Sequence, residues 1–372
     1  MKRVIVIGAG ILGTSAAYHL AKAGAKVTII DRQDLGQATD AAAGIVCPWL
    51  SQRRNKAWYT LAKEGAKYYS SLIKQLKDDG EKNTGYKKVG AISIHTEEEK
   101  LNKMEERAFM RREEAPEIGE ISRLSKEKTK ELFPPINTEF SSVHISGAAR
   151  VNGRALCLAL LNSAIKNGAD FIHGDASIVY QDHKVTGVMV DGRSLSADTV
   201  IVTAGAWANE LLKPLGINFL VSPQKAQIVH LRMPEADTGE FPVIMPPNNQ
   251  YILAFDDNRI VIGATHEDNK GYDLSVTAGG LHEIFDKALA VASELNDCEL
   301  IETRVGFRPF TPGFLPVIGP LLGYEGILIA NGLGASGLTV GPFLGGQLAK
   351  LALGNELDID LNDYNVQEAI AK

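Results

Sequence analysis

Residues 8–13 read Gly-Ala-Gly-Ile-Leu-Gly, and this glycine pattern constrains the fold more than any other feature of the chain. Gly8 permits a tight turn, Gly10 lets the backbone approach a pyrophosphate, and Gly13 lets a helix pack closely on a strand. A helix that starts at this turn offers free N–H groups and its positive dipole end to an anion. The pattern predicts a dinucleotide-binding turn, with an ordinary glycine-rich turn as the alternative.

The residues around this turn supply the context that the motif needs. Residues 3–7 are β-branched and apolar, which favours a strand, and residues 11–23 carry apolar side chains at helical spacing. A second apolar strand, 26–30, ends at Asp31, an acid that could accept hydrogen bonds from a ribose diol. The chain therefore begins with a strand–helix–strand unit built to hold a dinucleotide.

Composition narrows the class of protein further. A length of 372 residues suggests roughly two domains, and 45% hydrophobic residues indicate a globular chain. A net charge of −6 argues against a broad nucleic-acid surface.

No apolar run approaches the ~20 residues of a membrane-spanning helix, so no transmembrane segment is predicted. The three cysteines, Cys47, Cys157 and Cys298, are far apart, which disfavours a disulfide framework or zinc site and fits a cytoplasmic protein. No metal site is predicted.

Hydrophobic periodicity and turn residues predict the remaining elements. Helices are expected, in chain order, at 55–79, within the highly charged stretch 97–132, and at 152–167, 281–292 and 338–353. Strands are expected at 176–181, 184–191, 194–197 and 198–203, in several parts of 222–265, and at 327–330, with an extended segment from Arg304.

Two later glycine-rich turns point to FAD rather than NAD. Residues 203–207 and 331–337 each follow an apolar strand, and the second precedes a helix of small residues. A helix N-terminus at that place could face the partly anionic ring of a reduced flavin. The alternative for the second turn is an ordinary helix N-cap at Ser336.

Taken with residues 38–44 and 306–309, these segments resemble the D-amino-acid oxidase superfamily of FAD-dependent oxidoreductases, notably its glycine oxidase, sarcosine oxidase and D-amino-acid dehydrogenase branches. The resemblance spans essentially the whole chain. It implies an α/β fold (α+β overall) with a Rossmann-like FAD-binding domain and a substrate domain built on a mixed or antiparallel β-sheet. The FAD-binding domain would comprise residues 1–85, 144–221 and 304–372, and the substrate domain residues 86–143 and 222–303.

The resemblance also implies which residues bind FAD. They are, in chain order, Gly8, Gly10, Ile11, Leu12, Gly13, Asp31, Arg32, Ala38, Thr39, Ala43, Gly44, Val46, Ala204, Gly205, Trp207, Gly334, Ala335, Ser336, Gly337, Leu338 and Thr339. Sarcosine-oxidase-like relatives attach FAD through a cysteine near the C-terminus. No cysteine follows Cys298 in this chain, so noncovalent FAD is expected.

Three residues match substrate-contacting positions of such relatives. Arg308 would grip a substrate carboxylate, because a planar guanidinium binds a carboxylate bidentately and stays charged. Tyr251 would add a second hydrogen bond to that carboxylate, and His266 would contact the substrate or tune its charge. The alternatives are a structural arginine, ordinary sheet packing of the tyrosine and a surface-loop histidine.

Four neighbouring residues are left with open roles. Arg53 and Arg54 could meet an acidic substrate or the cofactor, although solvated surface charge is favoured. Trp49 could cover the flavin or pack between domains. Cys47 is expected to be a small buried filler rather than a reactive thiol.

The predicted reaction is oxidation of the Cα–N bond of a small amino acid or secondary amine of the glycine, sarcosine, D-amino acid or proline kind. Hydride transfer to flavin N5 would give an imine that hydrolyses to an oxo acid. The acceptor would be O₂ or a quinone-type electron carrier, and a homo-oligomer is possible. The alternatives are FAD-dependent oxidation of a hydroxy acid or polyol phosphate on the same fold, and a non-enzymatic or NAD-binding module.

Overall fold

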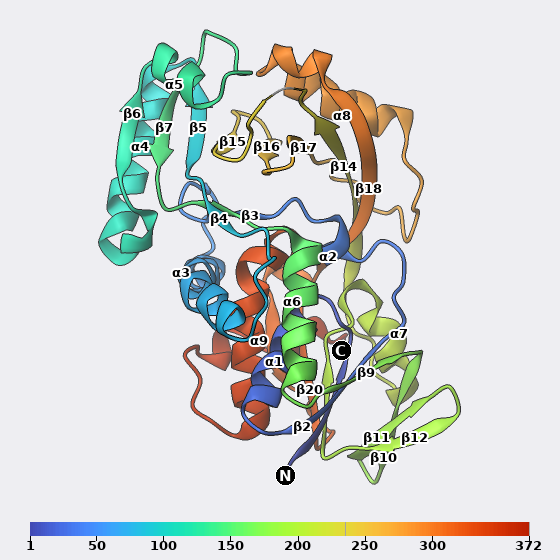
Figure 1. Cartoon of the computed structure of the whole chain (residues 1–372). Coiled ribbons are helices and arrows are strands. Elements are labelled where there is room, and N and C mark those ends of the chain that lie inside the picture. The colour runs from blue at the N-terminus through green and yellow to red at the C-terminus, as the bar shows by residue number, and fades with distance from the viewer. Residues whose placement is uncertain (235, 372) are drawn as a thin grey trace.

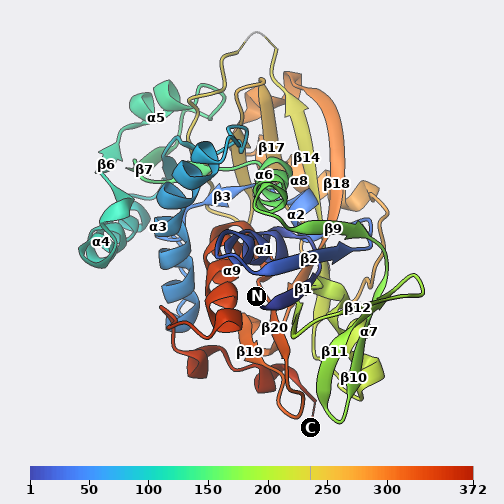
Figure 2. The ribbon, with the colours of Figure 1, turned by 60° about the horizontal axis from the view of Figure 1, so that its bottom comes forward.

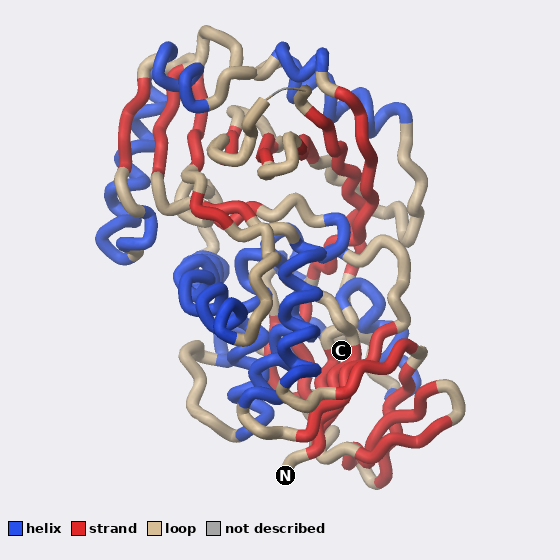
Figure 3. The backbone as a smooth tube through the Cα atoms, in the orientation of Figure 1, coloured by secondary structure: helices blue, strands red, loops and turns tan. Residues whose placement is uncertain are grey.

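A computed structural model describes residues 1–234 and 236–371. Two large sheets dominate it, one at each end of the molecule, with a group of helices packed on the lower sheet in Figure 1. Figure 3 shows the strands of the two sheets in separate regions, with short strands between them. Within the described residues, no helix has both the length and the apolar character needed to cross a membrane.

The first sheet has six strands, and five of them are parallel. Its spatial order is β19 (Val317–Pro320), β20 (Ile327–Asn331), β13 (Thr199–Val202), β1 (Arg3–Ile7), β2 (Lys26–Asp31) and β9 (Asp170–His173), with β19 antiparallel to β20. Val4 and Val6 join one buried cluster while Ile5 and Ile7 join another. Both faces of the sheet are therefore buried, which explains the unbroken apolar run of the first strand.

Helices cover one face of this sheet and a small sheet covers part of the other. The helices are α1 (Ile11–Lys22), α3 (Lys56–Asp78), α6 (Gly153–Lys166) and α9 (Gly337–Leu353). On the opposite side lie α7 (Ala208–Leu212) and the antiparallel strands β10 (Ala176–Gln181), β11 (Lys184–Val190) and β12 (Arg193–Ser196), seen at the lower right of Figure 2.

The second sheet has eight strands, antiparallel except for the pair β15–β5. Its order is β18 (Glu299–Phe310), β14 (Ser222–Arg232), β17 (Arg259–Gly263), β16 (Tyr251–Ala254), β15 (Val243–Met245), β5 (Ala91–His95), β7 (Ser141–Ile145) and β6 (Ile121–Leu124). It is flanked by α4 (Glu98–Glu114), α5 (Lys126–Leu132) and α8 (Ala278–Leu289).

Short elements connect the two halves. They are α2 (Ala38–Ala41) and the strands β3 (Ile45–Val46), β8 (Ala149–Arg150) and β4 (Lys87–Lys88). The 3₁₀ turns are η1 (Pro116–Ile118), η2 (Gly205–Trp207), η3 (Lys213–Leu215), η4 (Ser293–Asp297), η5 (Pro312–Phe314), η6 (Gly334–Ser336), η7 (Leu361–Tyr364) and η8 (Val366–Ala369).

The mixed α/β class is confirmed, but one local expectation was wrong. Residues 121–124, expected within a charged helical stretch, form β6, because they pair with β7 at the edge of the sheet. The extended segment expected from Arg304 is confirmed: it is the second half of β18, which starts at Glu299. Two predicted domain boundaries, 143/144 and 303/304, fall inside β7 and β18. The division into an FAD-binding and a substrate domain stays our proposal.

Candidate active site

The carboxyl ends of four parallel strands meet at one edge of the six-stranded sheet. Gly8 follows β1, Asp31 ends β2, Thr203 follows β13 and Asn331 ends β20. All four line one cavity of about 560 Å³. Ligands of open α/β sheets bind at this edge, so the topology itself selects the cavity as the functional site.

The first glycine turn is shaped by backbone contacts that only glycine permits. Gly8 has a φ of +104°, and a Cβ there would lie 2.5 Å from the carbonyl oxygen of Thr203. A Cβ on Gly13 would lie 1.8 Å from the Gly8 carbonyl oxygen. Gly13 does not line the cavity; its part is to bring α1 against β1, as its place in the motif suggested.

Donors and a carboxylate fix the loop around the start of α1. The backbone N–H of Ile11 donates to Thr39 Oγ1 over 3.0 Å, which ties the segment around α2 to the helix N-terminus. The Asp31 carboxylate accepts from the N–H groups of Ala9 and Gln33 and from Gln37 Nε2, at 2.5, 2.5 and 2.8 Å. Asp31 is thus held rigidly where it lines the cavity.

Beyond Asp31 the cavity wall is acidic. Arg32 forms ion pairs with Asp34, Asp175 and Glu210, at 2.9, 3.5 and 3.2 Å, and all four residues line the cavity. At the same end Trp207 stacks on Tyr272, with ring centroids 5.3 Å apart, and the Tyr272 hydroxyl donates to the carbonyl of Ala206. This end of the site offers hydrogen-bond acceptors and an aromatic wall.

The third glycine-rich turn closes the other side of the cavity. Asn331 Nδ2 donates to the carbonyl of Gly205 over 2.9 Å and joins this turn to η2. A Cβ on Gly205 or Gly337 would meet nothing within 4 Å, so these two residues leave room on the cavity wall. The start of α9 faces the same space and supplies a second helix N-terminus.

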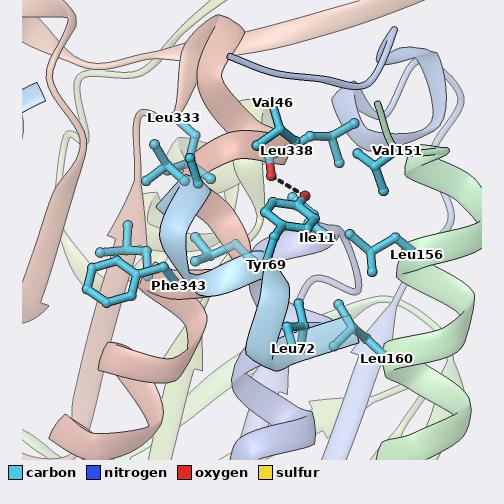
Figure 4. Close-up of a cluster of buried hydrophobic side chains, with 14 of the residues drawn as sticks. Ile11, Val46, Tyr69, Leu72, Val151, Leu156, Leu160, Leu333, Leu338 and Phe343 are labelled. Atoms are coloured by element: carbon cyan, nitrogen blue, oxygen red, sulfur yellow. Dashed lines mark hydrogen bonds between the residues drawn. The ribbon is translucent and has the colours of Figure 1, made fainter. Parts of the chain in front are cut away.

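A packed floor holds α9 in place below this turn. Figure 4 shows Tyr69 of α3 among buried side chains that include Ile11, Leu338 and Phe343, with its hydroxyl bonded to the carbonyl of Leu338. That hydrogen bond measures 2.5 Å. There α9 packs against both α1 and α3, and this close packing fixes the position of its first turn.

The residues present fit FAD. The wall combines two helix N-termini, glycines that leave space and a carboxylate at the end of β2, which are the donors and acceptors that a pyrophosphate and a ribose require. Of the predicted cofactor residues, seventeen line the cavity: Gly8, Gly10, Ile11, Leu12, Asp31, Arg32, Ala38, Thr39, Ala43, Gly44, Ala204, Gly205, Trp207, Gly334, Ala335, Gly337 and Leu338.

Four predicted cofactor residues lie outside the lining. They are Gly13, Val46, Ser336 and Thr339. Val46 is a buried core residue, and Thr339 donates to the carbonyl of Ile45 over 3.0 Å. Ser336 Oγ accepts from Trp58 Nε1 over 2.9 Å. In this structure these side chains support the wall rather than form it.

Arg308, Tyr251 and His266 are brought together at the other end of the same cavity. Arg308 lies on β18 opposite Gln224 on β14, and its Nη1 donates to Gln224 Oε1 over 3.2 Å. Tyr251 begins β16, and His266 follows the strand β17 that pairs with β16. The three residues are separated in the sequence and come together because β16, β17 and β18 belong to the same sheet.

The charges at this end influence one another. Burial raises the pKa of Tyr251, while the nearby Arg308 cation opposes that rise. Burial lowers the pKa of Arg308. Partial burial and then the charge of Arg308 lower the pKa of His266. Near neutral pH the histidine is therefore uncharged, and Arg308 is the cation at this end of the cavity.

Sequence reasoning missed Gln224, Asn249 and Phe307. Asn249 and Phe307 line the cavity, and Gln224 bonds to Arg308. Phe307 lies next to Arg308 in the segment that carried the resemblance, which was an available signal. Gln224 carried no such signal, because its partner is 84 residues away.

The four residues left open are now placed. Cys47 and Trp49 are buried and line neither cavity, and burial raises the pKa of the Cys47 thiol to about 12, which makes it a poor nucleophile. Arg53 lines a second, outer pocket, whereas Arg54 is exposed and lines neither.

Comparison with known proteins shows which family the chain resembles. A family model described as FAD dependent oxidoreductase (DAO) matches residues 3–351. An uncharacterized oxidoreductase of Bacillus subtilis, YurR, is 65% identical over the full length of both chains, and glycine oxidase of Pseudomonas aeruginosa is 29% identical over 98% of each. The crystal structure of iminodiacetate oxidase from Chelativorans sp. BNC1 superposes with a TM-score of 0.95 at 46% identity, covering 98% of each chain.

Proposed function

The chain belongs to the DAO family of FAD-dependent oxidoreductases, and on that premise we propose that it oxidises the Cα–N bond of a small amino acid or secondary amine held by Arg308. The family makes it an FAD-dependent amine or amino-acid oxidase. The proposal adds the substrate class and the residues that hold it.

One observation carries the proposal. The half-buried guanidinium of Arg308 lines the cavity with a neutral amide as its hydrogen-bond partner, and among the described residues no acidic side chain compensates its charge. A desolvated cation without a counter-ion costs free energy, which an anionic ligand recovers. A substrate carboxylate supplies that anion and matches the planar fork of arginine.

Arg308 and Tyr251 position the substrate at their end of the cavity, and we call this pair the carboxylate clamp. Arg308 and the Tyr251 hydroxyl hold the two carboxylate oxygens, which leaves the Cα–H bond and the amine nitrogen directed into the cavity. The chemistry that bound FAD would supply here is two-electron oxidation, with the substrate hydride as the group removed.

His266 complements this clamp. Its lowered pKa keeps the imidazole uncharged near neutral pH, so it can accept a hydrogen bond from the substrate nitrogen without repelling it. The substrate must react as the neutral amine, because its lone pair assists departure of the hydride. The imine formed takes up water and gives an oxo acid and the free amine.

An anaerobic substrate panel tests the proposal. The purified flavoprotein is mixed without O₂ with glycine, sarcosine, proline, several D-amino acids and several hydroxy acids, and the visible band of oxidised flavin is followed. Bleaching by one or more amine-bearing acids is the expected result. Bleaching by hydroxy acids alone would show that the protein oxidises a hydroxyl group instead of an amine. His266 would then be the candidate base.

A further inference from the structure

A second pocket adjoins the substrate end of the main cavity. It is lined by Arg53, Asn55, Gln224, His266, Phe310, Gly313, Phe314 and Ala335. Two of these residues, His266 and Ala335, also line the main cavity, so the two spaces share a wall. Gln224 links them as well, because it lines the outer pocket and bonds to Arg308 in the inner one.

Arg53 gives the outer pocket its charge. It is the one ionised side chain of the lining at neutral pH, since His266 is uncharged there. Burial lowers the pKa of Arg53, and no acidic side chain of the described residues offsets that effect. Asp268, which accepts from Gln224 Nε2 over 3.0 Å, does not line the pocket.

The guanidinium of Arg53 is fixed in position, but most of its N–H groups have no hydrogen-bond acceptor among the described residues. It stacks on the ring of Trp58, 4.8 Å from the ring centroid, and Nη2 donates to the carbonyl of Phe314. Trp58 is itself anchored to Ser336 at the start of α9. A guanidinium has five N–H donors, and this arrangement leaves most of them free for a further acceptor. A stacked, planar guanidinium of this kind is preorganised to bind a carboxylate.

We propose that Arg53 binds a second carboxylate of the substrate, so that the preferred substrate is a secondary amine bearing two carboxylates, such as iminodiacetate. This proposal rests on the function proposed above: Arg308 holds one carboxylate in the inner cavity, and the other arm extends past His266 into the outer pocket. Two arginines, one in each of two pockets that share His266 and Ala335 in their linings, match a dianion, whereas glycine or sarcosine would use Arg308 alone.

Binding of two matched thioethers tests the proposal without turnover. Thiodiacetate and (methylthio)acetate both lack the oxidisable nitrogen and differ in the second carboxylate. Each is titrated into the holoenzyme and followed by the change in the flavin spectrum. Thiodiacetate is expected to bind roughly tenfold more tightly, since a hydrogen bond to a charged group contributes about this factor. Equal affinities in the wild-type protein would overturn the proposal.

Variants of Arg53 locate the effect. In Arg53→Gln the ratio of kcat/KM for iminodiacetate to that for sarcosine is expected to fall roughly tenfold, and Arg53→Lys should restore part of it. Arg54→Gln, which removes the adjacent exposed cation, is the matched control and should keep the wild-type ratio. The same flavin content in each variant shows that it has folded.

The two proposals fail in different ways. If the wild-type protein oxidises sarcosine but Arg53→Gln keeps its ratio, the outer-pocket assignment is wrong and the clamp stands. If neither iminodiacetate nor any monocarboxylate amine reduces the flavin, the proposed function itself is wrong.

Discussion

Arg308 on β18 and Gln224 on β14 face each other as a direct cross-strand pair, and Arg308 Nη1 donates to Gln224 Oε1 over 3.2 Å. Gln224 Nε2 donates to Asp268 over 3.0 Å, which turns the amide oxygen toward the arginine. The arginine is thus oriented by a neutral acceptor rather than by a carboxylate. Its positive charge therefore stays available for a ligand.

Replacing Arg308 by lysine tests the clamp. Lysine keeps the charge but loses the planar fork, so kcat/KM for amine-bearing acids should fall about 100-fold, equivalent to about 3 kcal/mol of lost charged hydrogen bonding. Steady-state kinetics measure this fall, and the ratio of flavin to protein absorbance confirms that FAD is retained. An Arg308→Ala variant with bound FAD and full activity would refute the clamp.

Replacing Gln224 by glutamate should convert the neutral partner of Arg308 into a competing counter-ion. A carboxylate at this position pairs with the guanidinium, so KM for a carboxylate substrate should rise at least tenfold, roughly the cost of displacing a charged hydrogen bond. Gln224→Leu removes the hydrogen bond without adding charge and serves as the comparison. If the leucine variant raises KM as much as the glutamate variant does, the charge argument is incorrect.

Adding a methyl group at Gly10 should weaken FAD binding while leaving the fold intact. A Cβ there would meet only Thr39 Oγ1, at 3.3 Å, and Gly10 lines the cavity where the pyrophosphate is expected. The Kd of FAD for the apoprotein of Gly10→Ala should rise roughly tenfold, measured by flavin fluorescence. Gly279→Ala on α8, where a Cβ meets nothing within 4 Å, is the control and should bind FAD as the wild-type protein does.

His230 should make the fold sensitive to acid. It is 1% exposed, and burial followed by the charge of Arg304 lowers its pKa to about 3. Between the ordinary histidine pKa of about 6.5 and pH 3 the unfolded chain binds a proton that the folded chain does not. Stability contributed by the neutral ring is therefore complete above pH 6.5 and is lost as the pH falls through this window.

Replacing His230 by leucine should flatten that dependence. The free energy of unfolding, measured with urea at several pH values between 7.5 and 4.5, should fall less steeply in the variant, by up to about 1.4 kcal/mol per pH unit below pH 6. His282→Gln changes an exposed histidine of α8 and is the control. Parallel curves for the wild-type protein and His230→Leu would show that His230 does not drive acid unfolding.

Local patterns predicted the dinucleotide unit well, because its signals lie within a short stretch. The strand, turn and helix at residues 3–22 follow from β-branched residues, three glycines and apolar spacing, and β2 ends at Asp31 as expected. The prediction was wrong at β6, because the density of charged residues between 97 and 132 favoured helix there. Its four half-exposed residues, Ile121–Leu124, sit at a sheet edge, where the neighbouring strand decides the conformation.

The sequence by itself determined the βαβ turn, the cofactor class and the family, since glycine conformations and helix N-termini are properties of a few consecutive residues. Tertiary structure alone decided that Gln224 meets Arg308, that Tyr251 and His266 share their cavity, and that Arg53 lies in the adjoining pocket. The hydrogen bonds that place Arg308 and Arg53 join residues 84 and 261 positions apart along the chain, namely Arg308 with Gln224 and Arg53 with Phe314. Pairing at such distances is set by strand register and packing of the whole sheet, which no local pattern encodes.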